Sequence, residues 1–296
     1  MLSKLRNILL PITTPFTPDG VDHSALRSNI DRWSATGIGG YVILGSTGER
    51  VHLDEREYRE VIETTRAVAP QDLAFIVGAG QHSVTGANKE IKTAAAAGAD
   101  AVLVITPHYY RAAMTQEVLV DYYTAVADSS PVPVLLYSMP ALTGIKLEPE
   151  TIARLSQHQN IIGVKDSSND VAGFTETVKL CPRDFAVLTG NGTVLFDALR
   201  AGATGAILAV GCVVPEICVE ILNAFNDGDE DRASFLQSKL TPLATAVTTK
   251  YGIGGLKAAL DLAGYKGGDV RAPLRPPGES ARAEIARLLA DAKAAG

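Results

Sequence analysis

The sequence has few cysteines and no run of basic residues, and these absences exclude several classes of protein. Three cysteines at irregular spacing (Cys181, Cys212 and Cys218) do not make a disulfide framework. Cys212 and Cys218 stand among apolar residues, so we expect small core side chains rather than catalytic thiols. The net charge is −6 and the lysines and arginines are scattered, so a nucleic-acid partner is not expected.

Long apolar runs and metal-binding spacings are also missing. The first apolar stretch is short and Pro11 interrupts it, so we expect no signal peptide and no membrane-spanning helix, and we predict a cytoplasmic protein. The five histidines show no metal-ligand spacing. Gly78-Ala79-Gly80 lacks the third glycine of a dinucleotide-binding fingerprint. The sequence therefore predicts no metal, no cofactor and no membrane partner.

Short apolar runs alternate with longer amphipathic segments along residues 1–228. Near-continuous apolar strands separated by helices are typical of a parallel sheet covered by helices. About eight such units favour a (β/α)8 TIM barrel over the runner-up, an open doubly wound sheet. Residues 229–296 hold no further strand candidate and are predicted to form a C-terminal helical region. The expected strands are Ile8–Thr13, Tyr41–Leu44, Ala74–Val77, Ala101–Ile105, Val134–Tyr137, Ile161–Lys165, Ala186–Thr189 and Gly205–Leu208.

Lys165 ends the apolar run that begins at Ile161. Lysine is rarely buried without a reason, so its position leaves two interpretations open. One is an ordinary solvated charge where a strand leaves the core. The other is a desolvated amine that loses its proton near neutral pH and attacks a carbonyl group. The residues that end the neighbouring strands favour the second interpretation.

In a barrel of this kind the active site lies at the carboxyl ends of the strands. Tyr137 ends the strand before Lys165 and is a candidate proton carrier, since a phenol both donates and accepts a proton. The second expected strand is followed by Gly45-Ser46-Thr47-Gly48-Glu49, whose glycines permit a tight turn and whose amide groups can cradle a carboxylate. Glu49 is expected to be a structural hydrogen-bonding residue. Hydroxyls and one amine at one mouth suit carbonyl chemistry better than metal binding.

Three motifs in this order resemble the dihydrodipicolinate synthase / N-acetylneuraminate lyase family. They are Gly45-Ser46-Thr47-Gly48-Glu49, Tyr137 followed by Pro140 and Thr143-Gly144, and Gly163-Val164-Lys165-Asp166-Ser167. The resemblance runs from Pro11 to Leu274 and implies a (β/α)8 barrel, a lysine Schiff base with pyruvate or a related 2-oxo acid, and an aldehyde as second substrate. It also implies a homotetramer built as a dimer of dimers.

The resemblance also assigns roles to single residues. Lys165 would form the Schiff base and Tyr137 would be the proton shuttle. Ser46 would relay protons to Tyr137, and Tyr109 would reach in from a neighbouring subunit. Thr47 and nearby amides would hold the carboxylate. Gly190 and Ile207 match positions that line the pyruvate pocket.

The choice of a member within the family depends on the aldehyde side of the site. Leu142 stands where dihydrodipicolinate synthases usually carry an arginine for the carboxylate of aspartate semialdehyde. Gly192 and Thr193 replace the acidic pair that holds the sugar in sialic acid lyases. Several segments look most like 4-hydroxy-2-oxoglutarate aldolases, in which Ser167 would contact substrate, although that group has Ser-Asn instead of Ser46-Thr47.

The sequence therefore favours a class I aldolase that cleaves 4-hydroxy-2-oxoglutarate to pyruvate and glyoxylate. Condensation of pyruvate with aspartate semialdehyde, as in a 4-hydroxy-tetrahydrodipicolinate synthase, is the alternative, together with other sugar-acid aldolases. A scaffold that only binds 2-oxo acids is a further alternative. The presence of Lys165, Tyr137 and Ser46 together argues against it.

Overall fold

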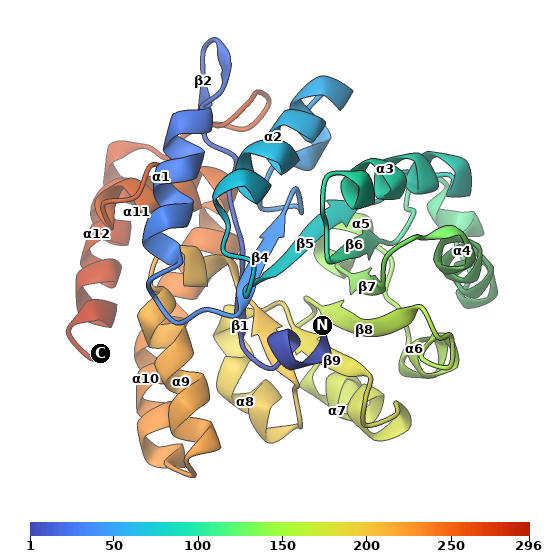
Figure 1. Cartoon of the computed structure of the whole chain (residues 1–296). Helices are drawn as coiled ribbons and strands as arrows, with labels where there is room; N and C mark the ends of the chain where they lie inside the picture. Colours follow the sequence, from blue (N-terminus) through green and yellow to red (C-terminus); the bar gives the residue numbers. More distant parts are fainter.

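The computed structural model describes all residues, 1–296, and its centre is a closed barrel of eight parallel strands (Figure 1). The barrel closes because the first strand pairs with the last, with Ile8 opposite Ala206. This confirms the predicted TIM barrel and excludes the open sheet. The barrel strands are β1 (Ile8–Pro11), β4 (Gly40–Ile43), β5 (Ala74–Ala79), β6 (Ala101–Ile105), β7 (Val134–Ser138), β8 (Ile161–Asp166), β9 (Ala186–Thr189) and β10 (Gly205–Ile207).

Helices surround the barrel and occupy most of the connections between its strands (Figure 1). Alternation along each strand explains why the strand sequences are apolar throughout: Leu9 points into the barrel, whereas Ile8 and Leu10 pack under the helices. The surrounding helices are α1 (His23–Trp33), α2 (Glu55–Val68), α3 (Val84–Ala96), α4 (Gln116–Ser129), α5 (Pro140–Thr143), α6 (Pro149–Leu155), α7 (Val171–Leu180), α8 (Leu195–Arg200) and α9 (Pro215–Asn226).

The first crossover differs from the sequence-based expectation, which contained no helix between the first two barrel strands. Helix α1 begins after Asp22, whose carboxylate accepts a hydrogen bond from the amide of Ala25 at 2.9 Å. Leu26, Ile30 and Trp33 are its buried large apolar residues, at helical spacing. A two-stranded hairpin, β2 (Phe16–Thr17) and β3 (Gly20–Val21), precedes it and was also not predicted.

The C-terminal helices are α10 (Glu230–Thr245), α11 (Gly252–Leu262) and α12 (Glu279–Lys293), and they lie together beside α9 (Figure 1). A π-helical turn, Ala246–Lys250, ends the stretch that the sequence predicts as one helix. The segment between α11 and α12 returns to the barrel, where Asp269 forms an antiparallel bridge with Phe16. A domain boundary after residue 228 stays a prediction.

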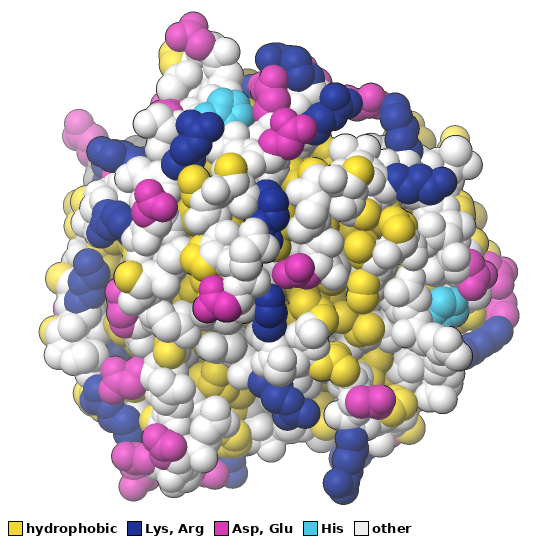
Figure 2. Space-filling model, in the orientation of Figure 1, with side chains coloured by type: hydrophobic (Ala, Val, Ile, Leu, Met, Phe, Trp, Pro, Cys, Tyr) yellow, Lys and Arg dark blue, Asp and Glu magenta, His cyan; other side chains and the backbone are white.

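The surface carries charges of both signs. On the face seen in Figure 2, Lys and Arg side chains alternate with Asp and Glu side chains, with apolar atoms between them. This face therefore presents no continuous basic surface of the kind that nucleic acids bind. None of the helices is both long enough and apolar enough to cross a lipid bilayer.

Candidate active site

Lys165 and Tyr137 lie side by side at the mouth of the barrel. They are paired residues on the adjacent strands β8 and β7. The Lys165 Nζ atom lies 4.4 Å from the centroid of the Tyr137 ring. The two residues are only 5% and 4% exposed, so the amine is largely withdrawn from water at the place where the sequence analysis expected it. The candidate nucleophile and the candidate proton carrier therefore lie next to each other.

Ser46 approaches the same tyrosine from the far side of the mouth. Its hydroxyl oxygen lies 3.4 Å from the Tyr137 hydroxyl, a long contact of the kind that tightens when a substrate binds. The turn that carries Ser46 is closed by two backbone bonds, from the Gly48 amide to the Gly45 carbonyl at 3.1 Å and from the Glu49 amide to the Ser46 carbonyl at 3.2 Å. Thr47, in the middle of this turn, is 8% exposed.

Gly190 and Ser167 form the wall next to Lys165. A Cβ atom on Gly190 would overlap the Ser167 hydroxyl and stand 2.7 Å from Cε of Lys165, so only glycine fits there. Its amide donates to the Asp166 carbonyl at 2.6 Å, and the Ser167 amide donates to the Ser138 carbonyl at 3.0 Å. Ile207 is fully buried in the barrel interior. These residues therefore gather where the sequence analysis expected a substrate pocket.

Tyr109 and Leu142 lie apart from this group on the surface of the chain. Tyr109 is 74% exposed and packs edge-on against Tyr110, with ring centroids 5.1 Å apart. Leu142 is 59% exposed on the short helix α5 that follows β7. One chain alone therefore does not bring Tyr109 to Tyr137, and its role at the site of a neighbouring subunit stays a prediction.

Asp166 and the buried cysteines have structural surroundings. Burial raises the pKa of the Asp166 carboxyl, and its Oδ1 atom accepts a hydrogen bond from the Ser168 amide at 2.7 Å. Cys212 and Cys218 are fully buried, and burial raises the pKa of the Cys218 thiol to about 12. Both cysteines are core residues, as predicted. The structure contains no cluster of three or more His, Cys, Asp or Glu side chains able to hold a metal ion.

Two residues of the C-terminal region that the sequence analysis did not single out, Lys257 and Arg271, support the Ser46 turn from behind. Lys257 on α11 forms an ion pair with Glu49 at 2.6 Å, and both side chains are almost completely buried. The amide of Arg271 donates to the other oxygen of Glu49 at 3.1 Å. Glu49 is thus a structural residue, as expected. Nothing in the sequence around Lys257 indicates a partner about 200 residues away, so this ion pair was not predicted.

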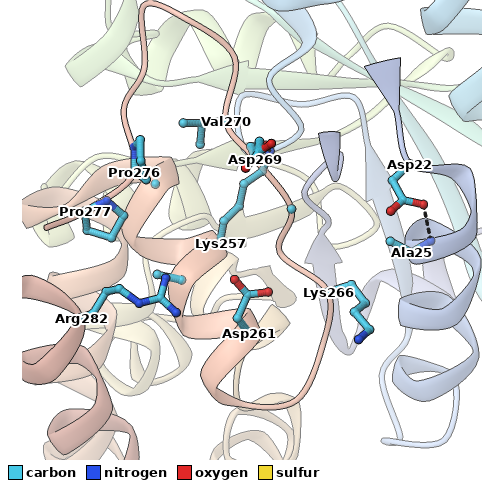
Figure 3. Close-up of a pocket in the computed structure, with 13 residues that line it drawn as sticks. Asp22, Ala25, Lys257, Asp261, Lys266, Asp269, Val270, Pro276, Pro277 and Arg282 are labelled. Atoms are coloured by element: carbon cyan, nitrogen blue, oxygen red, sulfur yellow. Dashed lines mark hydrogen bonds between the residues drawn. The ribbon is translucent and has the colours of Figure 1, made fainter. Parts of the chain in front are cut away.

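A cavity of about 580 Å3 lies outside the barrel mouth, between α11, α12 and the segment that joins them (Figure 3). Its lining is about half polar and half apolar, and charges of both signs face it, among them Asp261, Lys266 and Arg282. It contains none of the residues around Lys165. The candidate site around Lys165 is therefore identified by side-chain geometry and not by cavity size.

The comparisons with known proteins agree with this geometry. A family model described as the dihydrodipicolinate synthetase family matches residues 4–292. A 4-hydroxy-tetrahydrodipicolinate synthase from Methanothrix thermoacetophila is 36% identical over 286 residues, or 96% of each chain. Another from Acidiphilium cryptum is 35% identical over 278 residues, or 94% of each chain.

Solved structures extend the match to three dimensions. The dihydrodipicolinate synthase from Thermotoga maritima has a TM-score of 0.94 and 30% identity, and the match covers 98% of this chain and 99% of that one. A prophage protein of the same family from E. coli K12, solved with pyruvate, has a TM-score of 0.90 and 31% identity, with 97% and 98% covered. The chain therefore belongs to the dihydrodipicolinate synthetase family and is a carbon–carbon lyase of the class I, lysine Schiff-base type.

Proposed function

We propose that this protein joins pyruvate to an aldehyde through a Schiff base on Lys165. The neutral amine adds to the C2 carbonyl of pyruvate, and loss of water leaves an iminium. Removal of a proton from C3 gives an enamine, which forms a new carbon–carbon bond with the aldehyde carbon. The observation that carries this proposal is the position of Lys165, which is almost buried and packed against a tyrosine at the barrel mouth.

Tyr137 is proposed as the group that moves protons during these steps. It would protonate the oxygen that leaves the carbinolamine, take up the proton that is removed from C3, and then give that proton to the alkoxide formed at the aldehyde carbon. Ser46 would connect Tyr137 to solvent, with Tyr109 of a neighbouring subunit completing the relay in a homotetramer, a dimer of dimers. The 3.4 Å separation of the Ser46 and Tyr137 oxygens supports the first part of this relay.

The pyruvate carboxylate is proposed to lie against the Ser46-Thr47 turn. Backbone amides of a tight turn form a concave anion site, and the Thr47 hydroxyl adds a donor. Gly190, Ser167 and Ile207 would form the walls, since Gly190 leaves room close to Cε of Lys165. We place the reaction in the cytoplasm, which is consistent with three cysteines that are all free.

The proposed second substrate is aspartate semialdehyde, which makes the protein a 4-hydroxy-tetrahydrodipicolinate synthase. Relatives of that name match 94–97% of the chain at 32–36% identity, which favours this reaction over the aldolase reaction that the sequence motifs favoured. Arg111 is proposed to provide the guanidinium group that Leu142 does not. Its Nε atom lies 2.8 Å from where a Cβ on Gly144 would stand, so a guanidinium borders the same loop as Leu142.

A second candidate is cleavage of 4-hydroxy-2-oxoglutarate to pyruvate and glyoxylate. The observation that favours it is Leu142, because a leucine makes no charged contact with the carboxylate of aspartate semialdehyde. Both candidates use the same Schiff base and differ only in the aldehyde.

Two measurements on the purified protein test these proposals. Borohydride with pyruvate should attach a reduced pyruvate to Lys165, identified by peptide mass spectrometry; labelling elsewhere, or none, contradicts the Schiff base. A panel of aldehydes with pyruvate should then give the highest kcat/KM for aspartate semialdehyde. Faster turnover of glyoxylate, or of 4-hydroxy-2-oxoglutarate in the cleavage direction, would replace the first candidate with the second.

A further inference from the structure

Lys257 is the most deeply buried lysine in the molecule. It lies on α11 in the C-terminal region, is 2% exposed, and its ammonium group has three oxygen partners. These are the Glu49 carboxylate at 2.6 Å, the Thr14 carbonyl at 2.7 Å and the Asp269 carbonyl at 2.5 Å. Figure 3 shows its side chain extended from α11 towards the segment that carries Asp269. The ammonium group therefore makes two hydrogen bonds to backbone carbonyls and one ion pair with a carboxylate.

Glu49 receives this cation at a strained position of the chain. Its φ of 53° lies in the left-handed region, which non-glycine residues adopt only when their surroundings hold them there. One carboxylate oxygen contacts Lys257, and the other lies 3.1 Å from both the Arg271 amide and the His52 ring. The conformation at Glu49 thus depends on partners in the C-terminal region.

Two short paths lead from Lys257 to the reacting groups. Along the first, Glu49 donates its amide to the Ser46 carbonyl, and the Ser46 hydroxyl faces Tyr137. Along the second, the Thr14 hydroxyl donates to the Gly48 carbonyl at 2.7 Å, while the Thr14 carbonyl accepts from Lys257. Lys257 therefore contacts Glu49, the last residue of the turn. It also contacts Thr14, which follows β1 and donates a hydrogen bond to the turn.

From this arrangement we infer that Lys257 is a positioning residue of the active site. It holds the turn Gly45–Glu49 in position through its buried ion pair with Glu49. It thereby positions the Thr47 backbone amide and the Ser46 hydroxyl, which the turn carries. The C-terminal helices thereby complete a site to which they contribute no reacting atom. The inference rests on the proposed role of this turn in pyruvate binding.

Loss of Lys257 would leave its three oxygen partners without a cation or donor. Glu49 would keep a buried carboxylate without a cation, and the Thr14 and Asp269 carbonyls would lose their donor. Without the Glu49 and Thr14 contacts nothing ties the turn to α11, so the turn moves and carries the carboxylate site and Ser46 with it. The expected result is weaker binding of pyruvate and slower proton transfer, with Lys165 itself unchanged.

The test compares Lys257→Met with the matched control Lys266→Met, since Lys266 is an exposed lysine lining the cavity beside α11. Well below the melting temperature, Lys257→Met should raise the KM for pyruvate at least tenfold and lower kcat. Lys165 should still be labelled by borohydride at saturating pyruvate. Lys266→Met should leave all three quantities within twofold of the wild-type values.

Adding Glu49→Gln to Lys257→Met separates positioning from stability. Removing the unpaired carboxylate should restore much of the melting temperature, whereas the KM for pyruvate should stay high. Recovery of both would show that the pair contributes only stability and would overturn the inference. An unchanged KM in folded Lys257→Met would also overturn it.

If Lys257→Met does not fold, Glu49→Gln alone carries the test, because it keeps the shape of the side chain and weakens only the charge. It should raise the KM for pyruvate about threefold or more, and an unchanged value overturns the inference. Absence of borohydride labelling in the wild-type protein would instead contradict the proposed function, so the two failures are distinguishable.

Discussion

Two buried lysines of this chain differ in what surrounds them. Lys165 is 5% exposed, has no carboxylate oxygen within 4 Å and packs on the ring of Tyr137. Lys257 is 2% exposed and is bonded to one carboxylate and two carbonyl oxygens. Burial alone therefore does not make a lysine a nucleophile. What differs is what surrounds the nitrogen: Lys257 is held by oxygen acceptors on every side that it uses, whereas Lys165 lies against an aromatic ring at the barrel mouth.

Two opposite effects act on the pKa of Lys257. Burial lowers the pKa of its ammonium group, while the neighbouring Glu49 carboxylate opposes that change. At Lys165 the neighbour is instead a tyrosine ring, and the mouth of the barrel lies beside it. The following predictions compare these two environments.

Replacement of Lys165 should have the largest effect. Lys165→Ala removes the nucleophile, and we expect turnover to fall by about 10^4-fold or more, because no other group can form the iminium. Steady-state kinetics and borohydride labelling with pyruvate measure the loss. If the label moved to Lys257 in this variant, or if turnover persisted within tenfold, the distinction between the two lysines would be wrong.

Replacement of Tyr137 should come next. Tyr137→Phe keeps the ring beside Lys165 but removes the hydroxyl, so we expect kcat to fall by about 10^2 to 10^4-fold. Ser46→Ala removes only the relay and should cost less. Pre-steady-state labelling is the sharper measurement, since the Schiff base should form more slowly in Tyr137→Phe while Lys165 remains the labelled residue. Equal rates of labelling would exclude Tyr137 from this step.

A smaller change in kcat/KM is expected from substitutions at the surface residues that we propose to face the aldehyde. Leu142→Arg adds a guanidinium on exposed α5, and we expect about a tenfold gain in kcat/KM for aspartate semialdehyde at constant KM for pyruvate. Arg111→Leu should reduce the same quantity in the wild-type background. The aldehyde panel measures both, and a change confined to pyruvate would show that this loop does not contact the aldehyde.

The smallest effect concerns a second ion pair of the C-terminal segment. Arg271 contacts Glu57 through both guanidinium nitrogens, and this hydrogen bond holds the pKa of the Glu57 carboxyl below its ordinary value. A lowered pKa stabilises the folded state above the ordinary glutamate value of about 4.3, and this stabilisation is lost as the pH falls through the lower, folded-state value.

Glu57→Gln should therefore lower the melting temperature at neutral pH by about 2 °C. The difference from the wild type should shrink below about pH 4.3. Thermal unfolding at several pH values checks this. No difference at any pH would mean that Glu57 acts only through the hydrogen bond that it accepts from the Asp54 amide at the start of α2, which glutamine also makes.

Much of the barrel could be predicted from sequence because its strands are short and apolar throughout. Ala101–Ile105 and Ala186–Thr189 have the predicted bounds, and the other six strands differ by one or two residues at their ends. The group around Lys165 was also predictable, because strand order in a barrel brings the ends of neighbouring strands together. Helix α1 was missed although its apolar residues have helical spacing.

The contacts that support the site were not predictable in the same way. Glu49 and Lys257 are joined only after the chain has passed round the whole barrel and folded its last helices against it. Neither periodicity nor strand order contains that pairing. Tyr109 could not be placed either, for a different reason. It is predicted to act in the site of another subunit, and in the single chain it lies on the surface.

The bridge between Phe16 and Asp269 has a consequence for how such an enzyme changes over time. It joins the C-terminal segment to the loop after β1, close to the Ser46 turn, whereas Leu142 lies on an exposed helix that makes no such junction. Substitutions near the bridge disturb packing and chemistry together, and selection removes them. In the proposed mechanism, substitutions around Leu142 would change only the aldehyde that meets the enamine. New aldehyde preferences can therefore accumulate on one side of the mouth while the pyruvate half is inherited intact.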